Sequence, residues 1–236
     1  DSLQGDITNN AVVAFNQITA GTYGGAIFGA GAVTIDGSVT FTGANTYSGG
    51  TTISTGSVLS LGGAGSIQGN VGNSGTLQFA GTGTTFGGSI SGSGSVQQVS
   101  GTTVLTGTST HTGGTTISGG TLQLGIDNAL TMAGALAING GTFDLNGNAQ
   151  TVGALSGTGG GVTLNGGSLT VNQSGNTTYA GIVSGAGSFI KDGSGTLILT
   201  SANTNANTVV TGGTLQGTTT SLQGNIVNNA TVVFDQ

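Results

Sequence analysis

The sequence contains no cysteine, no proline and no tryptophan, and only 3% of its residues are charged. Lys191 is the only cation, His111 is the only histidine, and all seven acidic residues are aspartate. Nucleic-acid binding depends on many Lys and Arg contacts, so a phosphate-binding surface is excluded, and the same shortage argues against anionic lipid. The lack of cysteine leaves the redox compartment open, because it suits an exported chain and a cytosolic one equally.

Other segments are also missing. No apolar run approaches the ~18 residues of a membrane-spanning helix. The chain opens on Asp1 in the middle of a repeat pattern, without the charged and apolar regions of a signal peptide. We therefore expect a processed product or an excised fragment of a longer protein.

Glycine, in contrast, supplies 51 of the 236 residues, a share about three times the usual ~7%. Leu, Ile, Val and Phe stay above the ~20% below which a chain is expected to be disordered. The chain can therefore bury a core, although a thin one. Its solubility must come from Thr, Ser, Asn and Gln instead of charged side chains.

Internal repeats are extensive. The segment SLQGDITNNAVVAFNQ (2–17) recurs at an offset of 219 as SLQGNIVNNATVVFDQ (221–236), with eleven of sixteen positions identical, and a weaker copy, SIQGNVGNSGTLQFAG, occupies 66–81. A second motif, GANTYSGGTTISTGSVLSLG (43–62), recurs as GTSTHTGGTTISGGTLQLG (107–125). The copies at 66–81 and 107–125 both follow the first copy of their motif at an offset of 64. A degraded copy of the second motif, SANTNANTVVTGGTLQG, spans 201–217.

Apolar and polar residues alternate within each unit, as in Val33 and Ile35 or Leu122 and Leu124. Period two over three to five residues predicts short strands with one buried face. The strands are separated by pairs such as Gly49-Gly50, Asn9-Asn10 and Gly140-Gly141, which we expect to supply the positive φ angles of tight turns. No helical periodicity persists, so the chain is predicted to be all β.

Self-similar blocks favour a solenoid of stacked coils over a sandwich of hairpins. If the offset of 64 corresponds to three coils, each coil takes about 21 residues, and the chain forms roughly eleven coils of a rod about 50 Å long. We predict one continuous β-solenoid over residues 1–236. Its internal repeats lie near 2–65, 66–125 and 126–220, and 221–236 begins the next block. Low charge and the absence of proline fit in-register stacking, in which like charges would face each other on every rung.

The run LTGTSTHTGGTTISGGTLQLG (105–125) closely resembles the passenger-associated repeat of bacterial autotransporters. The segment 134–157 is similar to the stretch that often precedes such a repeat, and so is 191–200. The resemblance implies a right-handed, single-stranded parallel β-helix displayed outside the outer membrane, with a translocating barrel elsewhere in a longer precursor. It implies no active site. At Asn205-Ala206-Asn207 the third copy departs from Tyr47-Ser48-Gly49-Gly50, which puts the turn geometry there in question.

Candidate chemical groups are few. His111 aligns with Tyr47 of the first repeat copy, so a tolerant turn position is a better interpretation than a catalytic base. An enzyme of another kind, a β-helix that cleaves polysaccharides, would need a pair of carboxylates beside the scissile bond. The candidate residues for such a site are Asp36, Asp127, Asp144 and Asp192, together with the lone Lys191. These acids lie at different phases of the repeat and need not share a face.

Three further patterns have both a functional and a structural interpretation. Asp144 to Asn148 has the spacing of the start of a calcium loop but lacks the distal Glu, so an Asn-rich turn is favoured. The Gly-x-Gly segments at 29–31, 92–94 and 185–187 recur without a following helix and are interpreted as turns. The Thr groups at 51–52, 115–116 and 218–220 could form outward rows that bind ice, although exposed strand positions explain them more simply.

The sequence therefore predicts a structural or adhesive stalk segment, extracellular at the bacterial surface or secreted, that acts as a rigid spacer without catalysis. We expect no catalytic, cofactor-binding or metal-binding residues. The alternatives are a binding module for glycan or ice, and a polysaccharide lyase. The expected partners are neighbouring repeat blocks of the same protein, with end-to-end self-association left open and any host ligand unknown.

Overall fold

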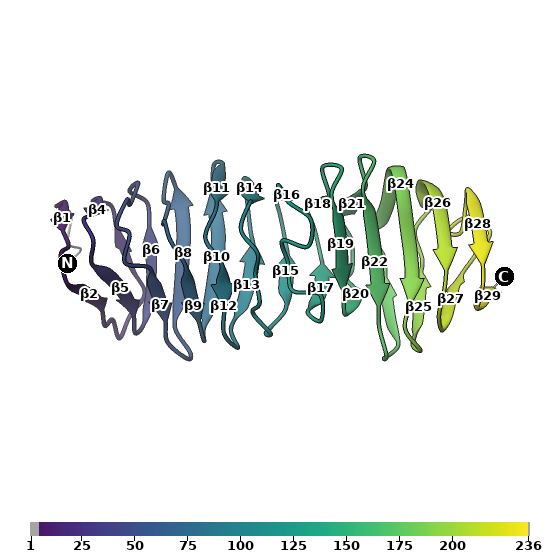
Figure 1. Ribbon diagram of the computed structural model, residues 1–236, viewed down its shortest axis with the longest axis horizontal. Helices are drawn as coiled ribbons and strands as arrows, with labels where there is room; N and C mark the ends of the chain where they lie inside the picture. Colours follow the sequence, from purple (N-terminus) through teal and green to yellow (C-terminus); the bar gives the residue numbers. More distant parts are fainter. Residues whose placement is uncertain (1–4, 236) are drawn as a thin grey trace.

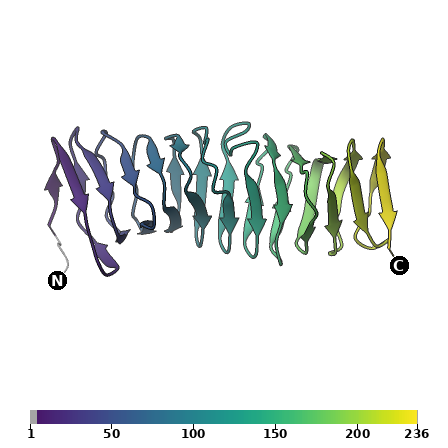
Figure 2. The ribbon, with the colours of Figure 1, turned by 90° about the horizontal axis from the view of Figure 1, so that it is seen from below.

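The computed structural model describes residues 5–235 as a single rod of parallel strands stacked along one axis (Figure 1). The predicted all-β solenoid is confirmed, and the N-terminal and C-terminal turns lie at opposite ends of the rod (Figure 2). The first few positions of the first repeat and the last position of the final one lie outside the described residues. Within residues 5–235, no helix is long and apolar enough to cross a membrane.

Each turn of the solenoid passes over three faces. Face 1 is a continuous ladder of twelve strands, β3 (Gly21–Tyr23), β6 (Ser38–Phe41), β8 (Val58–Gly63), β10 (Thr76–Gly81), β13 (Ser95–Gln98), β15 (Thr115–Ile117), β17 (Ala135–Ile138), β20 (Ala154–Ser156), β23 (Thr177–Tyr179), β25 (Thr196–Leu199), β27 (Thr214–Gly217) and β29 (Thr231–Phe234). A parallel bridge between Gly157 and Tyr179 joins its two sheets. The rod therefore has about 12 turns.

Face 2 follows face 1 in every turn, and face 3 follows face 2. The face 2 strands are β1 (Ile7–Thr8), β4 (Ile27–Phe28), β11 (Thr84–Phe86), β14 (Thr102–Leu105), β16 (Thr121–Leu124), β18 (Thr142–Asp144), β21 (Gly161–Thr163) and the first half of β24 (Ile182–Asp192). Face 3 holds β2 (Val12–Phe15), β5 (Ala32–Ile35), β7 (Thr51–Ile53), β9 (Val71–Asn73), β12 (Ile90–Ser91), β19 (Ala149–Val152), β22 (Ser168–Asn172), the second half of β24, most of β26 (Thr204–Val210) and β28 (Asn225–Asn228). The first two residues of β26 pair with the first half of β24 and lie on face 2.

Most turns are shorter than the turn of about 21 residues that the repeat suggested. On face 1, the residue numbers of register partners on neighbouring turns differ by as little as 17, for Gln216 and Val233, and by as much as 22, for Gly157 and Tyr179. The chain forms about 12 turns, one more than the roughly eleven coils that a turn of about 21 residues predicts. At ~4.8 Å per turn, the rod is roughly 55 Å long.

The cause of this difference is the phase of the repeat. Thr51–Ile53 lies on face 3, where it pairs with Val33 and Val71. Its copy in the second motif, Thr115–Ile117, lies on face 1. An offset of 64 therefore makes three turns plus one face, not three turns. The offset of 219 behaves likewise, because β2 lies on face 3 and its copy β29 lies on face 1.

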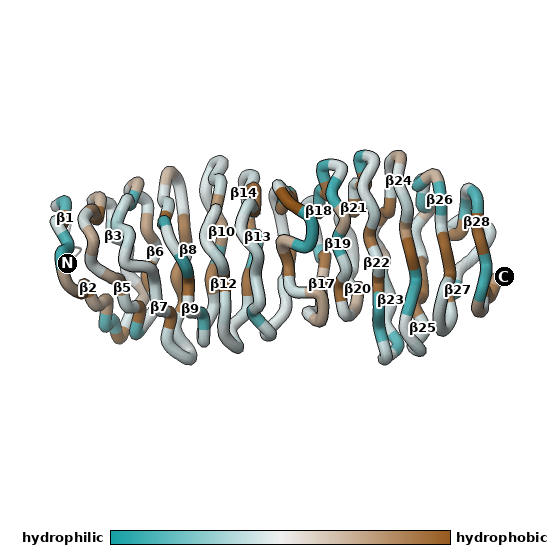
Figure 3. Tube along the Cα trace, in the orientation of Figure 1, coloured by the Kyte–Doolittle hydropathy of each residue, from teal (hydrophilic) through white to brown (hydrophobic). Residues whose placement is uncertain are grey.

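All strand pairs in the described residues are parallel, and all except the β24–β26 pair keep one constant register, so residues stack in columns. On face 1 the inward column runs through Val39, Leu59, Leu77 and Val96, and every member is buried. Hydrophobic segments accordingly recur at each turn along the rod (Figure 3). On the outside of face 1, uncharged polar side chains also stack, and the Gln78 amide donates to Gln97 on the next turn at 2.8 Å. The predicted in-register stacking of uncharged polar residues is confirmed.

Glycine allows neighbouring turns to approach closely at the corner after each aromatic-Gly-Gly motif. A Cβ on Gly88 would lie 1.9 Å from the carbonyl oxygen of Gly69, and one on Gly25 would lie 2.4 Å from that of Gly5. Gly50 and Gly141 have positive φ angles, as predicted. The same expectation for Asn9-Asn10 is wrong, because neither residue has a positive φ; Asn9 is instead buried and hydrogen-bonded.

Candidate functional site

The histidine lies inside the rod. His111 is fully buried, so its interpretation as a tolerant turn residue is wrong. Its Nε2 lies 3.1 Å from the hydroxyl of Thr115. In the first repeat copy, the Tyr47 hydroxyl lies 2.6 Å from the hydroxyl of Thr51, which occupies the position equivalent to Thr115. The aligned residues therefore form one internal polar pair in both copies, and the imidazole has no access to solvent for general-base chemistry.

The third repeat copy keeps this pair, with one residue fewer between its two members. Asn205 donates from Nδ2 to the hydroxyl of Thr208 at 3.0 Å, and both residues are buried. The shorter spacing is absorbed in the strand pairing, because the register between β24 and β26 shifts between Gly185 and Ser188. The altered geometry anticipated at Asn205-Ala206-Asn207 is therefore found as a bulge in the partner strand β24, which has one residue more than β26 at this point, and both strands remain continuous.

Burial also changes how His111 titrates. Removal from water lowers the pKa of His111 below its ordinary value, and a weaker backbone hydrogen bond at Gly114 acts in the opposite direction. Burial raises the pKa of Tyr47 to about 12, and the Thr51 hydroxyl opposes this more weakly. Both side chains are therefore neutral inside the rod near neutral pH.

Acidification is expected to destabilise the rod through His111. The unfolded imidazole has a pKa near ~6.5, and the folded one is lower, so the unfolded state takes up the proton first. The stability given by the neutral ring is fully present above pH ~6.5 and is lost as the pH falls through the folded pKa, at no more than about 1.4 kcal/mol per pH unit. Urea unfolding of the wild type at pH 7.5 and at pH 5 measures this loss.

The first repeat copy supplies the matched control, because Tyr47 occupies the same position. The His111→Tyr variant should keep the hydrogen bond to Thr115 and lose the part of the pH dependence that belongs to histidine. Equal pH dependence in the variant and the wild type would show that His111 is not the titrating group.

The lone cation is also buried. The side chain of Lys191 points inward and donates from Nζ to the carbonyl oxygens of Asp192 at 2.6 Å, Gly193 at 3.1 Å and Gly212 at 3.2 Å. Burial lowers the pKa of Lys191, and the nearby Asp192 charge acts more weakly in the opposite direction. Lys191 therefore caps carbonyl groups at a corner between two turns. It does not face a substrate groove, as a polyuronate lyase would require.

Each candidate acid is engaged by its neighbouring turn. Asp36 accepts from the hydroxyl of Ser54, Asp127 accepts from the backbone N–H of Ala149 at 2.8 Å, and Asp192 accepts from the hydroxyl of Thr211 at 3.2 Å. Among residues 5–235, no group of three or more His, Cys, Asp or Glu side chains is placed to hold a metal ion. The acids serve as inter-turn acceptors distributed along the rod.

The polar side chains of Asp144 and Asn148 are engaged in hydrogen bonds within the rod. Asp144 accepts from the Gln123 amide at 2.8 Å, from the Asn146 backbone at 2.9 Å and from the Asn165 amide at 2.8 Å. The Asn148 amide donates to the carbonyl of Leu124 on the previous turn at 3.1 Å. Because the carboxylate is already satisfied by N–H groups, the predicted Asn-rich turn is the correct interpretation.

The Thr pairs do not form outward rows. Thr51 and Thr115 are buried, where they bind Tyr47 and His111, and they lie on different faces. Thr218 and Thr220 are exposed, but their hydroxyls bind each other at 2.8 Å within a turn. The proposed ice-binding surface of aligned threonines is therefore not built by these residues.

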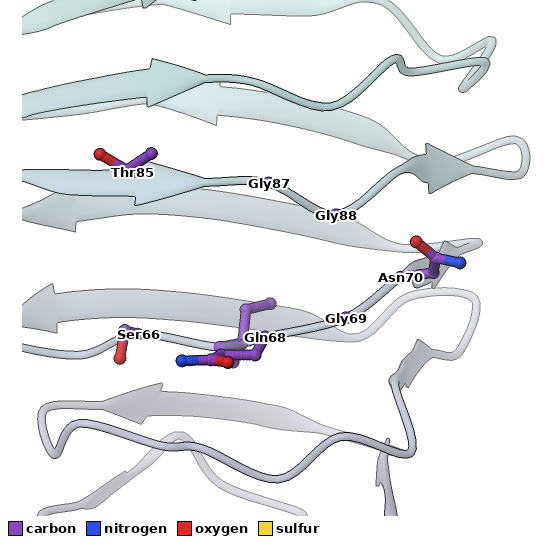
Figure 4. Close-up of a pocket in the computed structure, with 8 residues that line it drawn as sticks. Ser66, Gln68, Gly69, Asn70, Thr85, Gly87 and Gly88 are labelled. Atoms are coloured by element: carbon purple, nitrogen blue, oxygen red, sulfur yellow. The ribbon is translucent and has the colours of Figure 1, made fainter.

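One surface hollow of about 290 Å³ lies on face 2 between neighbouring turns (Figure 4). Gln68 and Asn70 contribute side chains from one turn, and Thr85, Gly87 and Gly88 line it from the next. The Asn70 side chain already accepts the backbone N–H of Ser89 at 3.0 Å. The lining residues include no acid, base or nucleophile paired with a base, so the hollow offers only neutral hydrogen-bonding groups.

An asparagine that bridges three turns was missed in the sequence. Asn45 accepts the backbone N–H of Ile27 at 2.8 Å and donates to the carbonyl of Ser66 at 2.9 Å. Asn203 makes the same two contacts, with Val183 at 2.7 Å and Ser221 at 2.7 Å. The signal was available in the aligned triplet Ala-Asn-Thr of the first and third copies. Its function is to hold the stack together.

The comparisons with known proteins agree with this geometry. The family described as passenger-associated-transport-repeat matches residues 29–66, 100–124 and 189–216. No curated protein and no solved structure matches the chain. The three matched segments contain the three polar pairs described above and lie within one uninterrupted stack. Three segments of the chain therefore match the passenger-associated-transport repeat, as expected for an autotransporter passenger with repeats.

Proposed function

We propose that this chain is a rigid spacer in the stalk of its passenger protein and performs no catalysis. The observation that carries the proposal is the use of its polar side chains. The acids, the buried amides, His111 and Lys191 bind the backbone or side chains of their own and adjacent turns. Because the polar groups of the rod are used to hold its own turns together, they stiffen the rod and do not form a site for another molecule.

The family implies that the protein is secreted or surface-exposed. Outside the cell, a stack without disulfides depends on burial and on inter-turn hydrogen bonds for its rigidity. Its inward columns are continuous and its outward columns are almost uncharged, so one turn resembles the next in stability and in surface chemistry. These properties suit a spacer that sets the distance between the cell and a separate adhesive region.

The proposal is tested on the purified chain. Small-angle X-ray scattering should report an elongated particle, and limited proteolysis should leave the stack intact. A panel of soluble polysaccharides, including polyuronates, should show no new reducing ends or unsaturated products after prolonged incubation. A glycan array probed with the same chain should show no saturable binding.

Two results would contradict the spacer function. Turnover of any polysaccharide that persists in a Lys191→Gln variant and in preparations of independent origin would identify an enzyme. Saturable glycan binding that is lost in a Gln68→Ala variant would assign the face 2 hollow as a binding site and favour the binding-module alternative.

A further inference from the structure

The C-terminal turn repeats a motif whose other two copies are covered by a following turn. The same phenylalanine ends each copy, as Phe15, Phe79 and Phe234. Phe15 is 8% exposed and Phe79 is 1% exposed, whereas Phe234 is 50% exposed. Ile226 and Val232, the other inward residues of this turn, are only partly buried. The last turn therefore presents the apolar surface that the internal copies bury.

A recurring hydrogen-bonding latch joins each internal copy to the turn above it. Asn9 accepts the backbone N–H of Ala11 in its own turn and donates to the carbonyl of Ala32 on the next turn at 2.8 Å. Asn73 does the same with Gly75 and with Ser95, again at 2.8 Å. The side chain reaches across because a glycine lies over it.

The overlying glycines leave no space for a side chain. A Cβ on Gly31 would lie 2.2 Å from the Asn9 side-chain oxygen, and a Cβ on Gly94 would lie 2.5 Å from that of Asn73. In the C-terminal turn, Asn228 accepts the backbone N–H of Ala230 at 3.1 Å, as the other copies do within their own turn. Its amide group has no protein acceptor among the described residues, so half of the latch is formed.

The second copy of the motif shows what fits above the last turn, because the two lie on the same faces. The second copy lies on faces 3 and 1 through β9 and β10, and the C-terminal copy lies on the same faces through β28 and β29. The second copy is covered by 86–96, with the pattern aromatic-Gly-Gly-x-Ile-x-Gly-x-Gly-x-Val. The same pattern follows the first copy, at 23–33. The cover is thus a defined sequence pattern that occurs twice in this chain.

We infer that residues 225–234 form a docking surface for a turn of this pattern, and that the next copy of the repeating block of the same protein supplies it. The inference rests on the proposed spacer function and adds how blocks join. Because the offset of 219 moves a strand from face 3 to face 1, each block is turned by one face relative to the last. Three blocks therefore return a given residue to its starting face.

The test compares the 236-residue chain with a chain extended by a second copy of residues 18–65 after Gln236. Amide exchange at Ile226, Val232 and Phe234 should slow by at least about tenfold in the extended chain. Asn228→Ala should lower Tm by about 2–4 °C in the extended chain and leave Tm unchanged in the original chain. Asn73→Ala is the internal control and should lower Tm in both.

Other outcomes would overturn the inference. If the last turn does not bind the added segment, amide exchange at Ile226, Val232 and Phe234 would be as fast in the extended chain as in the original one. Asn228→Ala would then leave Tm unchanged in both chains. Concentration-dependent dimers of the original chain that are lost in Asn228→Ala would make a second molecule the occupant. Neither result requires polysaccharide turnover or glycan binding, so a failure here is distinguishable from a failure of the spacer function.

Discussion

Replacing Gly88 by valine is expected to destabilise the rod by about 4 kcal/mol, which is at the high end for a single substitution. The added Cβ would lie 1.9 Å from the carbonyl oxygen of Gly69, so two backbones would have to separate. That separation would also weaken the Asn70 contact to the backbone of Ser89. Urea unfolding monitored by far-UV circular dichroism measures the change in free energy.

Gly175→Val is the matched control. A Cβ at Gly175 meets no atom within 4 Å, and the residue is exposed. Its substitution should change the free energy of unfolding by no more than about 0.5 kcal/mol. Similar losses in the two variants would mean that backbone flexibility, and not the close approach of turns, explains the aromatic-Gly-Gly motif.

The prediction of the fold succeeded because the relevant signals are local. Alternation such as Val33 with Ile35 specifies which side chains point inward, and a recurring motif indicates that each unit stacks on another like it. The absence of charge and proline follows from the same stacking. These properties depend on spacing along the chain, which the sequence displays directly.

The phase of the repeat could not be predicted, because spacing alone does not state how many residues make a turn. Thr51 and Thr115 occupy equal sequence positions but lie on different faces. This is possible because all three faces bury a column of alternating apolar residues against the same narrow interior. A motif that fits one face therefore fits the next, and repeat length is free to differ from whole turns.

The buried polar residues were misjudged for a related reason. A polar residue beside Gly-Gly usually marks an exposed turn, and the sequence therefore predicts such a turn at His111. The structure places it inward, where the Thr115 hydroxyl satisfies it. The pairing of Tyr47 with Thr51 and of His111 with Thr115 was visible as a constant four-residue spacing, but only the direction of both side chains gives that spacing a meaning.

Deleting one whole turn is expected to leave a shorter, folded rod. Thr76 is the register partner of Ser95, so removal of residues 76–94 joins Gly75 to the residue that stacks directly on Thr76. Gly107, which lies over Gly88 in the intact rod, would then lie over Gly69, and neither position carries a side chain. Scattering should show a particle shorter by ~4.8 Å, and the urea m-value should fall by roughly one-twelfth.

Deleting half a turn should have a much larger effect. Removal of residues 76–85 joins Gly75 to Phe86, which brings a face 2 segment to the place where face 1 must follow. The strands above this junction can no longer present their inward columns over Leu59 and Leu61, so we expect a loss of several kcal/mol or a second, separate unfolding transition. The longer deletion removes a whole turn and keeps the register of the stack, whereas the shorter one breaks the register. Equal stability of the two variants would therefore mean that the turns do not require registered stacking.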